Sequence, residues 1–386
     1  MKDRINISSP EIDIEKSLTG IREVLESGQM AQGPKTKLAE ETMANVFESE
    51  YGALVANGTV SLRAALIAGI AVKHSIVISE VDRALVGSEV IIPAFSFNAT
   101  LNSVLQSGAT ARVVDIDSVD YGLDVEKTKD VLKSNTLAIM PVDLYGQASS
   151  ITRKNPAFGS VTIIRDAAQA HGAELKGEPI VKHADVVSTS FYPTKNVAGG
   201  GEGGGIVTDN LEIAEIVKIY RNQGMSAPYV YEMVGDNLRM TDIQAVILQI
   251  GLEHIKEANA KRNQNANMLS SGLKEVEGLI LPVVRDDRNH VWHQYTIQVD
   301  RQTFGMDRLQ LRDKLSENGI GSGIYYPKTM TDHPSYKSHP RIIKEQTPNA
   351  DLIAQRVLSL PVHPRLKISD IERIVDTIKK IKLGKK

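Results

Sequence analysis

Seven short apolar runs between Tyr51 and Thr208 constrain the fold of this chain more than any other feature. They cover residues 53–56, 89–95, 111–116, 137–145, 161–166, 185–191 and 204–209, and most are rich in Val and Ile. Helical or loop segments separate these runs. Apolar strands joined by crossover segments are typical of a mostly parallel sheet that is covered on both faces. We therefore predict an α/β domain with a seven-stranded sheet.

The pattern changes to long helices beyond Asp209. Apolar residues recur every three or four positions in segments 211–224 and 241–278, and the second segment predicts a long helix that leaves the large domain. A strand at 292–299 and helices at 306–319 and 369–382 predict a smaller α+β domain. We expect a large domain at 1–250, which includes an N-terminal arm, and a linking helix with a small domain at 251–386.

Charge and composition exclude several classes of protein. The formal net charge of the 386 residues is -2, so the chain lacks the basic field that binds nucleic acid, and a small molecule is the expected partner. The absence of cysteine excludes thiolate nucleophiles and disulfide scaffolds. The histidines show no metal-ligand spacing, so we expect no metal. A polar N-terminus and the lack of a run of ~18 apolar residues predict no membrane span and a cytoplasmic protein.

A lysine lies between a predicted strand and a glycine-rich run. The segment TSFYPTKNVAGGGEGGGIVT places Lys195 just before six glycines that are interrupted once, by Glu202. Glycines allow a backbone to approach a ligand closely, so Lys195 is a candidate for covalent chemistry. The alternative is a surface lysine before a flexible hairpin. We assign its neighbours Phe191 and Tyr192 to core packing.

An acidic residue follows another predicted strand, in the segment IIRDAAQAHGA. Asp166 and Gln169 lie at the carboxyl end of this strand, where ligands of open α/β sheets bind. Asp166 and Lys195 can therefore share one crevice. The alternative is that Asp166 is a helix N-cap, a position that Asp favours.

A third motif, ANGTVSLRAAL, combines a tight turn with the start of a helix. Free amides at a helix start, together with the hydroxyls of Thr59 and Ser61, can bind a phosphate. Pyridoxal phosphate needs a lysine for its aldehyde, an acid beside its pyridine nitrogen and a cradle for its phosphate. The three motifs together therefore favour a pyridoxal phosphate site.

The ordered set of motifs resembles the DegT/StrS-like nucleotide-sugar aminotransferases, which are fold type I pyridoxal phosphate enzymes. The resemblance covers nearly the whole chain and includes NGTVSLRAAL, DAAQAHGA, SFYPTKNVAGGGEGG, DNLRMTDIQA and GIYYPKTMTDHPSY. It implies transfer of an amino group, from glutamate, to a keto-sugar carried on a nucleotide. It also implies that Lys195 holds the cofactor as a Schiff base, and that Asp166 and Gln169 contact the pyridine nitrogen and ring hydroxyl.

The same resemblance implies further cofactor contacts. Ser190, Gly58 and Thr59 correspond to residues that hold the phosphate, and Phe97 to an aromatic residue that stacks on the cofactor ring. Asn237 corresponds to an asparagine that reaches the phosphate of the neighbouring subunit, which implies a homodimer.

Several positions depart from the family pattern. Residues 71–88 replace a turn of a few residues, and this insertion can alter substrate or interface contacts. Arg165 precedes the aspartate where relatives commonly have Glu. Tyr325 and Thr331 take positions that histidine often holds, so we regard both as candidate substrate contacts.

Two other functions remain possible on this fold. A sugar dehydratase of the same family replaces the anchoring lysine with histidine, so Lys195 argues against it. A regulatory homologue without turnover is disfavoured by the presence of Lys195, Asp166 and Gln169 together.

Overall fold

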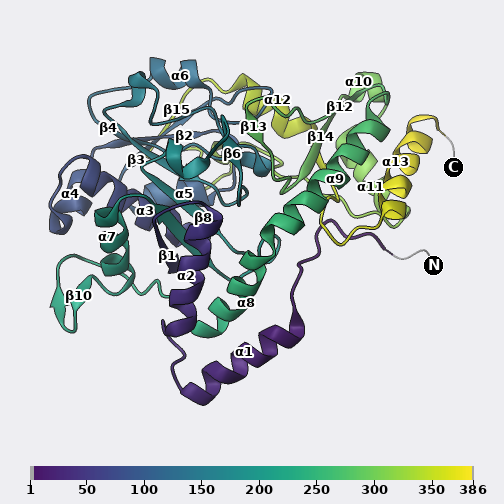
Figure 1. Cartoon of the computed structure of the whole chain (residues 1–386). Helices are drawn as coiled ribbons and strands as arrows, with labels where there is room; N and C mark the ends of the chain where they lie inside the picture. Colours follow the sequence, from purple (N-terminus) through teal and green to yellow (C-terminus); the bar gives the residue numbers. More distant parts are fainter. Residues whose placement is uncertain (1–3, 385–386) are drawn as a thin grey trace.

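The computed structural model describes residues 4–384, and its largest element is an eight-stranded sheet (Figure 1). The strands lie in the order β1-β9-β8-β5-β4-β2-β3-β15. Strand β9 is antiparallel to β1 and β8, and the other pairs are parallel. All seven predicted strands are present: β1 (Tyr51–Val55), β2 (Glu89–Pro93), β3 (Thr110–Val114), β4 (Thr136–Ile139), β5 (Thr162–Asp166), β8 (Val186–Ser190) and β9 (Gly204–Thr208).

The eighth strand, β15 (Ile342–Lys344), comes from the second half of the chain and was not predicted. It pairs with β3 at the edge of the sheet. With three residues, none of them fully buried, it is too short to produce a recognisable pattern. The segment around it returns to the large domain, because Met330 and Ile353 belong to the same hydrophobic core as the large sheet.

Helices cover both faces of this sheet, as expected for strands that are apolar throughout. Every residue of β2, β5 and β8 is buried. Side chains of α3 (Gly58–Lys73), α5 (Ala99–Gln106) and α7 (Leu211–Arg221) share one core. Helices α2 (Pro34–Val46) and α8 (Asp242–Glu253) contribute to the core of the other face. Strand ends and the loops that follow them therefore meet at one edge, between the two helix layers.

The small domain is built around a three-stranded antiparallel sheet. Its strands are β12 (Leu279–Ile280), β14 (Tyr295–Val299) and β16 (Val357–Leu360), and α9 (Ile255–Leu273), α11 (Arg308–Glu317) and α13 (Ile368–Lys382) pack on them. The long helix expected after residue 241 is divided, because the backbone of His254 leaves helical geometry between α8 and α9. We propose the domain boundary at this break, near residue 250.

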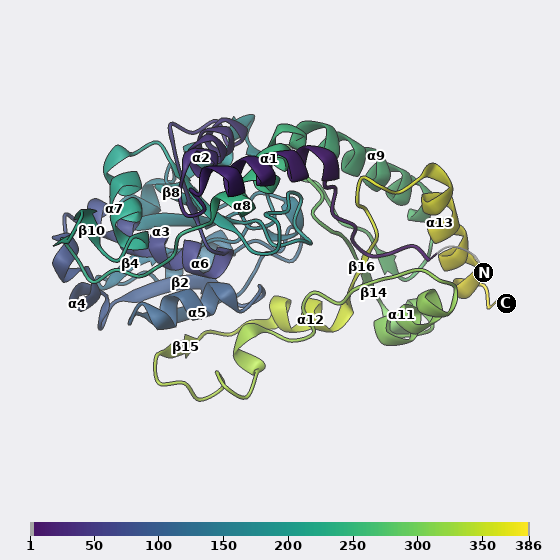
Figure 2. The same ribbon diagram turned by 90° about the horizontal axis from the view of Figure 1, so that it is seen from below.

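The N-terminal segment connects the two domains. Ile5 pairs with Ile320 of the small domain, and the chain then runs to α1 (Ile14–Ser27), which packs on α8 of the large domain through Val24 (Figure 2). The expected N-terminal arm therefore begins on the small domain, a contact that no local sequence pattern indicates.

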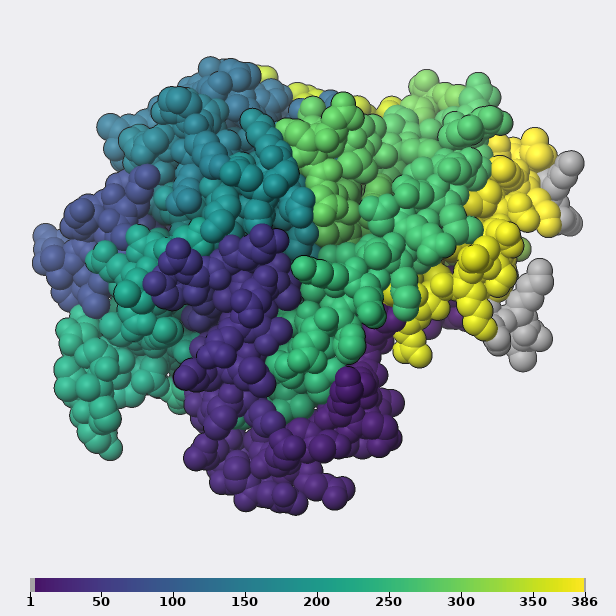
Figure 3. All heavy atoms as spheres, viewed as in Figure 1, coloured from purple at the N-terminus to yellow at the C-terminus, as the bar shows by residue number. Residues whose placement is uncertain are grey.

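A hairpin projects from the large domain, and the insertion 71–88 adds to it. A hairpin of β10 (Met225–Ala227) and β11 (Val230–Tyr231) extends at the lower left of Figure 3. The insertion 71–88 forms a 3-10 turn (Ile78–Glu80) and α4 (Val81–Leu85), whose Val81 and Leu85 are buried in the core. The remaining elements are α6 (Val125–Asp130), α10 (Arg301–Phe304), α12 (Pro348–Arg356), β6 (Glu174–Leu175), β7 (Glu178–Pro179), β13 (Arg288–Asn289) and four 3-10 turns (Leu144–Gly146, Pro156–Phe158, Ile180–His183, Met330–Asp332).

Within residues 4–384, no helix combines the length and apolarity needed to cross a membrane.

Candidate active site

A cavity of about 670 Å³ opens where several strands of the large sheet end at their carboxyl side. Apart from Ser61, which is buried and donates to the Gly205 carbonyl, the sequence singled out ten residues for cofactor or substrate binding, and the cavity brings together eight of them. They are Gly58, Thr59, Phe97, Asp166, Gln169, Ser190, Lys195 and Tyr325. Residues from distant parts of the sequence thus line one space of a size suited to a small ligand.

Asp166 is the last residue of β5, and its carboxylate is held in place on both oxygens. The Thr100 hydroxyl donates a hydrogen bond to Oδ2 at 3.0 Å, and the amide of Ala168 donates to Oδ1 at 3.2 Å. No helix follows Asp166, so its interpretation as a helix N-cap is wrong. Burial raises the pKa of Asp166, while its hydrogen bonds and the charge of Lys195 oppose this effect. The carboxylate is therefore oriented toward the cavity and can accept a further hydrogen bond.

Lys195 lies in the loop after β8. Its amine forms no hydrogen bond or ion pair with any residue from 4 to 384. Burial lowers the pKa of Lys195 to about 8, and the charge of Asp166 opposes this shift. An amine with such a pKa is partly uncharged near neutral pH, so it can act as a nucleophile or a base.

The turn before α3 forms a smaller set of anion donors than the sequence indicated. The Asn57 side chain caps α3 by accepting hydrogen bonds from the amides of Thr59 and Val60. These two amides are therefore already engaged. The Gly58 amide and the hydroxyls of Thr59 and Ser190 remain available to an anion at this end of the cavity.

Gly204 and Gly205, two of the glycines after Lys195, pack closely against other parts of the protein. A Cβ at Gly204 would lie 2.3 Å from the Asn57 carbonyl oxygen, and one at Gly205 would lie 2.4 Å from the Met43 sulfur. On the opposite side, a Cβ at Gly58 would lie 2.6 Å from the Cβ of Ser190. Glycine at these positions lets the turn before α3 approach β9 and the end of β8, which brings its donors into the cavity.

Gln169 connects the loop after β5 to Tyr326, a residue from the second half of the chain that packs against the core of the large sheet. Its side-chain oxygen accepts a hydrogen bond from the Tyr145 amide at 2.7 Å, and its nitrogen donates to the Tyr326 hydroxyl at 3.2 Å. The Tyr326 ring lies 6.0 Å from the ring of Phe97, which is 59% exposed. Phe97 thus presents an aromatic face that is free to stack on a planar ligand.

Asn237 and Thr331 do not line this cavity. Asn237 is exposed beside the projecting hairpin. Thr331 is 3% exposed and its hydroxyl has no hydrogen-bond partner within residues 4–384. None of residues 71–88 lines the cavity either, so the structure does not support a substrate contact from the insertion within its own chain.

The sequence alone did not indicate other residues of the cavity wall. Tyr192 is 47% exposed and lines the cavity, so its assignment to the core is wrong, whereas Phe191 is buried as expected. The position of Tyr192 in the same short segment as Lys195 was the signal that could have identified it as a residue of the cavity wall. His293 and Gln294 also line the cavity, and they come from the small domain.

The hydrogen bonds around His293 determine which of its two ring nitrogens carries the proton. The Asn196 amide nitrogen donates to the Val291 carbonyl at 2.9 Å, so its side-chain oxygen is the acceptor that faces His293 Nδ1 at 3.2 Å. Burial, followed by the charges of Lys195 and Arg262, lowers the pKa of His293 well below its usual range. His293 is therefore neutral and carries its proton on Nδ1, which leaves the Nε2 lone pair as an acceptor.

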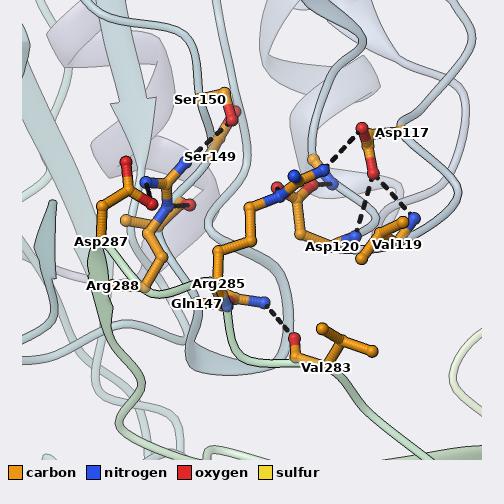
Figure 4. A network of polar contacts seen from close by, with 12 residues as sticks. Asp117, Val119, Asp120, Gln147, Ser149, Ser150, Val283, Arg285, Asp287 and Arg288 are labelled. Carbon is orange, nitrogen blue, oxygen red and sulfur yellow. Dashed lines mark hydrogen bonds and ion pairs between the residues drawn. The ribbon is translucent and has the colours of Figure 1, made fainter.

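An ion-pair network fixes the segment that leads to His293 (Figure 4). Arg285 forms ion pairs with Asp117 at 2.7 Å and with Asp120 at 2.6 Å. The Arg285 amide also donates to the side chain of Gln147 at 2.9 Å. These contacts tie the approach to β14 onto loops of the large domain, which positions residues of the small domain in the cavity.

The cavity fits the groups of pyridoxal phosphate. Asp166 provides an acceptor for a protonated pyridine nitrogen, and Lys195 provides an amine for an aldehyde. The donors of Gly58, Thr59 and Ser190 form a phosphate cradle that the missing side chain of Gly58 keeps open. The chain's own residues thus match the pyridine nitrogen, the aldehyde and the phosphate of this cofactor.

Comparison with known proteins identifies close relatives over the whole chain. A model of the DegT/DnrJ/EryC1/StrS aminotransferase family matches residues 11–379. The chain is 32% identical over 361 residues to a dTDP-3-amino-3,4,6-trideoxy-alpha-D-glucose transaminase of Streptomyces venezuelae, covering 93% of this chain and 90% of the relative. It is 31% identical over 391 residues to a UDP-N-acetyl-3-dehydro-alpha-D-glucosamine 3-aminotransferase of Acidithiobacillus ferrooxidans, covering 97% and 98%.

The fold also matches a solved structure. The crystal structure of S. venezuelae DesV in complex with a ketimine intermediate aligns with a TM-score of 0.85 and 30% sequence identity, covering 97% of this chain and 99% of that chain.

Proposed function

Because the chain belongs to the DegT/DnrJ/EryC1/StrS aminotransferase family, we propose that it transfers an amino group from glutamate to a nucleotide-linked keto-sugar, with pyridoxal phosphate as its cofactor. The observation that carries this proposal is the meeting of Lys195 and Asp166 in one cavity beside a set of phosphate donors. Neither the segment around Lys195 nor the segment around Asp166 would alone distinguish a catalytic role from a structural one.

Each cofactor-binding residue has a role that follows from its position. Lys195 holds the cofactor covalently, and the Asp166 carboxylate accepts a hydrogen bond from the protonated pyridine nitrogen. Gln169 and Phe97 contact the ring, and the cradle at the start of α3 holds the phosphate. When bound, the cofactor supplies an aldehyde that takes up the amino group and a ring that withdraws electrons from the adjacent carbon.

Lys195 also moves a proton during the reaction. A pKa of about 8 keeps a fraction of free lysine amines uncharged near neutral pH. Such an amine can take a proton from the carbon of the amino donor and return it at the next step. Asp166 preserves the charge of the ring nitrogen, and its contact with Thr100 keeps the carboxylate oriented.

The catalytic unit in this proposal is a homodimer. The exposed Asn237 lies outside the cavity of its own chain, which leaves its side chain available to the phosphate of a partner subunit. An amide side chain adds a neutral donor to the donors at the start of α3.

The proposal is tested with holoenzyme and two half-reactions. Glutamate should abolish the absorbance band of the covalently held cofactor, and one member of a panel of nucleotide-linked keto-sugars should restore it. Lys195→Ala should lose both responses, and the exposed Lys261→Ala serves as the matched control.

A protein that releases a dehydrated sugar without net amination would be a dehydratase instead. A protein that binds the cofactor but responds to neither glutamate nor any sugar would be a regulatory homologue, and both results contradict the proposal.

A further inference from the structure

Arg262 is a buried cation close to the candidate active site, and it lacks an ion-pair contact with any carboxylate of residues 4–384. It lies on α9 and is 5% exposed. One terminal nitrogen donates to the Trp292 carbonyl at 3.1 Å and to the His293 carbonyl at 3.4 Å. Its Nε has no hydrogen-bond partner, and no carboxylate within residues 4–384 forms an ion pair with it. A buried charge is costly unless an opposite charge compensates it.

This guanidinium faces a small chamber that adjoins Lys195. The chamber, of about 20 Å³, is lined by Ser8, Ser9, Glu11, Thr194, Lys195 and Arg262, among others. Thr194 and Lys195 also line the main cavity, so these two residues border both spaces. A space of this size admits one or two groups as large as water, such as the two oxygens of a carboxylate.

The chamber also offers hydroxyl donors. The side chains of Ser8, Ser9 and Thr194 form no hydrogen bond with any residue from 4 to 384. Three segments that are distant in the sequence build this wall: the N-terminal segment, α9 and the loop after β8. The Arg365 side chain and the small domain hold the N-terminal segment in place, through the Pro10 carbonyl and through Ile5.

The main cavity lacks a second cation. Lys195 is its only lysine, it contains no arginine, and its histidine is neutral. The segment 225–237, which contains the hairpin and Asn237, has no lysine or arginine, and the flanking Arg221 and Arg239 bind Glu40 and Asn222 of their own chain. An amino acid that donates its amine to this site must nevertheless bring a carboxylate to within one bond of the reacting carbon.

We propose that Arg262 and the hydroxyls of the chamber form the subsite for the α-carboxylate of the amino donor. This inference rests on the proposed aminotransferase function. The donor's α-carbon lies at Lys195, its carboxylate enters the chamber, and the rest of the donor remains in the larger cavity. The carboxylate supplies the direct ion-pair contact that Arg262 does not make with residues 4–384, and the planar guanidinium suits its two oxygens.

Glu11 modulates this subsite. It is exposed and lines the same chamber, and its charge favours the protonated form of Arg262. Burial lowers the pKa of Arg262 to about 10, so the guanidinium remains a cation at neutral pH. Glu11 therefore competes with the donor carboxylate for the same cation, and its removal strengthens donor binding.

The test measures donor binding and the two half-reactions separately in the holoenzyme. Glutarate, which has no amine to transfer, is titrated calorimetrically into the parent, Arg262→Met, Arg262→Lys and Glu11→Gln. Lys261→Met is the matched control, because it removes an exposed cation beside Arg262 on α9 that lines neither the chamber nor the main cavity. We expect Arg262→Met to weaken the binding of glutarate at least tenfold and to raise the KM for glutamate by a similar factor.

Further results follow from the same arrangement. Arg262→Lys should have an intermediate effect on both quantities, and Glu11→Gln should strengthen glutarate binding a few-fold. Lys261→Met should change neither glutarate affinity nor the glutamate KM. The half-reaction with the nucleotide-linked keto-sugar should stay within twofold of the parent in all four variants.

Equal glutarate affinity in Arg262→Met and the parent would overturn the subsite, as would equal losses in both half-reactions. If Arg262→Met does not fold, the opposite effects of Arg262→Lys and Glu11→Gln still decide the question, and parallel or absent effects reject it. Failure of the proposed function is distinct, because the parent itself would then not react with glutamate.

Discussion

The depressed pKa of Lys195 predicts that this lysine destabilises the cofactor-free protein. Its pKa of about 8 compares with 10.5 for an ordinary lysine. At about 1.4 kcal/mol per pKa unit, this difference corresponds to about 3 kcal/mol. Because the side chain is partly accessible through the cavity, we take this value as an upper limit. The amine forms no hydrogen bond with residues 4–384 that would offset the cost.

The sign of the pH dependence follows from the direction of the shift. Between pH 8 and 10.5 the unfolded state binds more protons at Lys195 than the folded state, so stability rises with pH in this window. Below pH 8 the buried amine is charged, and the folded protein is destabilised by the full amount. Replacing Lys195 with Met, which fills similar space without charge, should therefore stabilise the cofactor-free protein most at pH 7.

The assay compares thermal unfolding of cofactor-free parent and Lys195→Met from pH 7 to pH 10. With an unfolding entropy of about 2 cal/mol/K per residue, 3 kcal/mol raises the Tm of a chain this long by about 4 °C. The difference in Tm between Lys195→Met and the parent should narrow steadily above pH 8. The exposed Lys261→Met should have the same Tm as the parent. A variant that melts at or below the parent, or a gap that is constant with pH, would refute the reasoning.

Three other changes follow from the same site. Asp166→Asn should retain bound cofactor but lose at least about 100-fold in kcat, because the ring nitrogen loses its acidic partner; turnover within a few-fold of the parent would contradict this. Asn237→Asp should repel the phosphate of the partner's site. A heterodimer of Asn237→Asp with Lys195→Ala should then recover activity, and no recovery would exclude a shared site. Tyr325→His should change the acceptor kcat/KM about tenfold and leave the glutamate half-reaction unchanged; an altered glutamate reaction would rule out a role confined to the acceptor.

The sequence predicted much of the large domain because its evidence is local. A strand buried on both faces must be apolar along its whole length, so β2, β4, β5 and β8 are visible as runs of residues. Strand β15 has no such run, because three residues at a sheet edge need few apolar side chains. The break at His254 also escaped prediction, since apolar spacing continues through it.

Only part of the candidate site could be predicted from the sequence. Asp166 and Lys195 each follow a strand of the large sheet, so topology alone places both at its carboxyl edge. His293 follows no strand of that sheet and reaches the cavity because ion pairs of Arg285 fix the preceding segment. Thr331 belongs to a recognisable motif, yet it points away from the cavity into a buried position.

The sequence by itself determined the α/β class, the seven main strands and the residues that resemble a cofactor site. Periodicity and motifs carry this information because they record which side chains must be buried and which backbone turns are possible within a few residues. Only the tertiary structure joined Ser8 and Ser9 to Arg262 and Lys195. Those contacts connect residues far apart in the chain, and the packing of both domains against the N-terminal segment decides them.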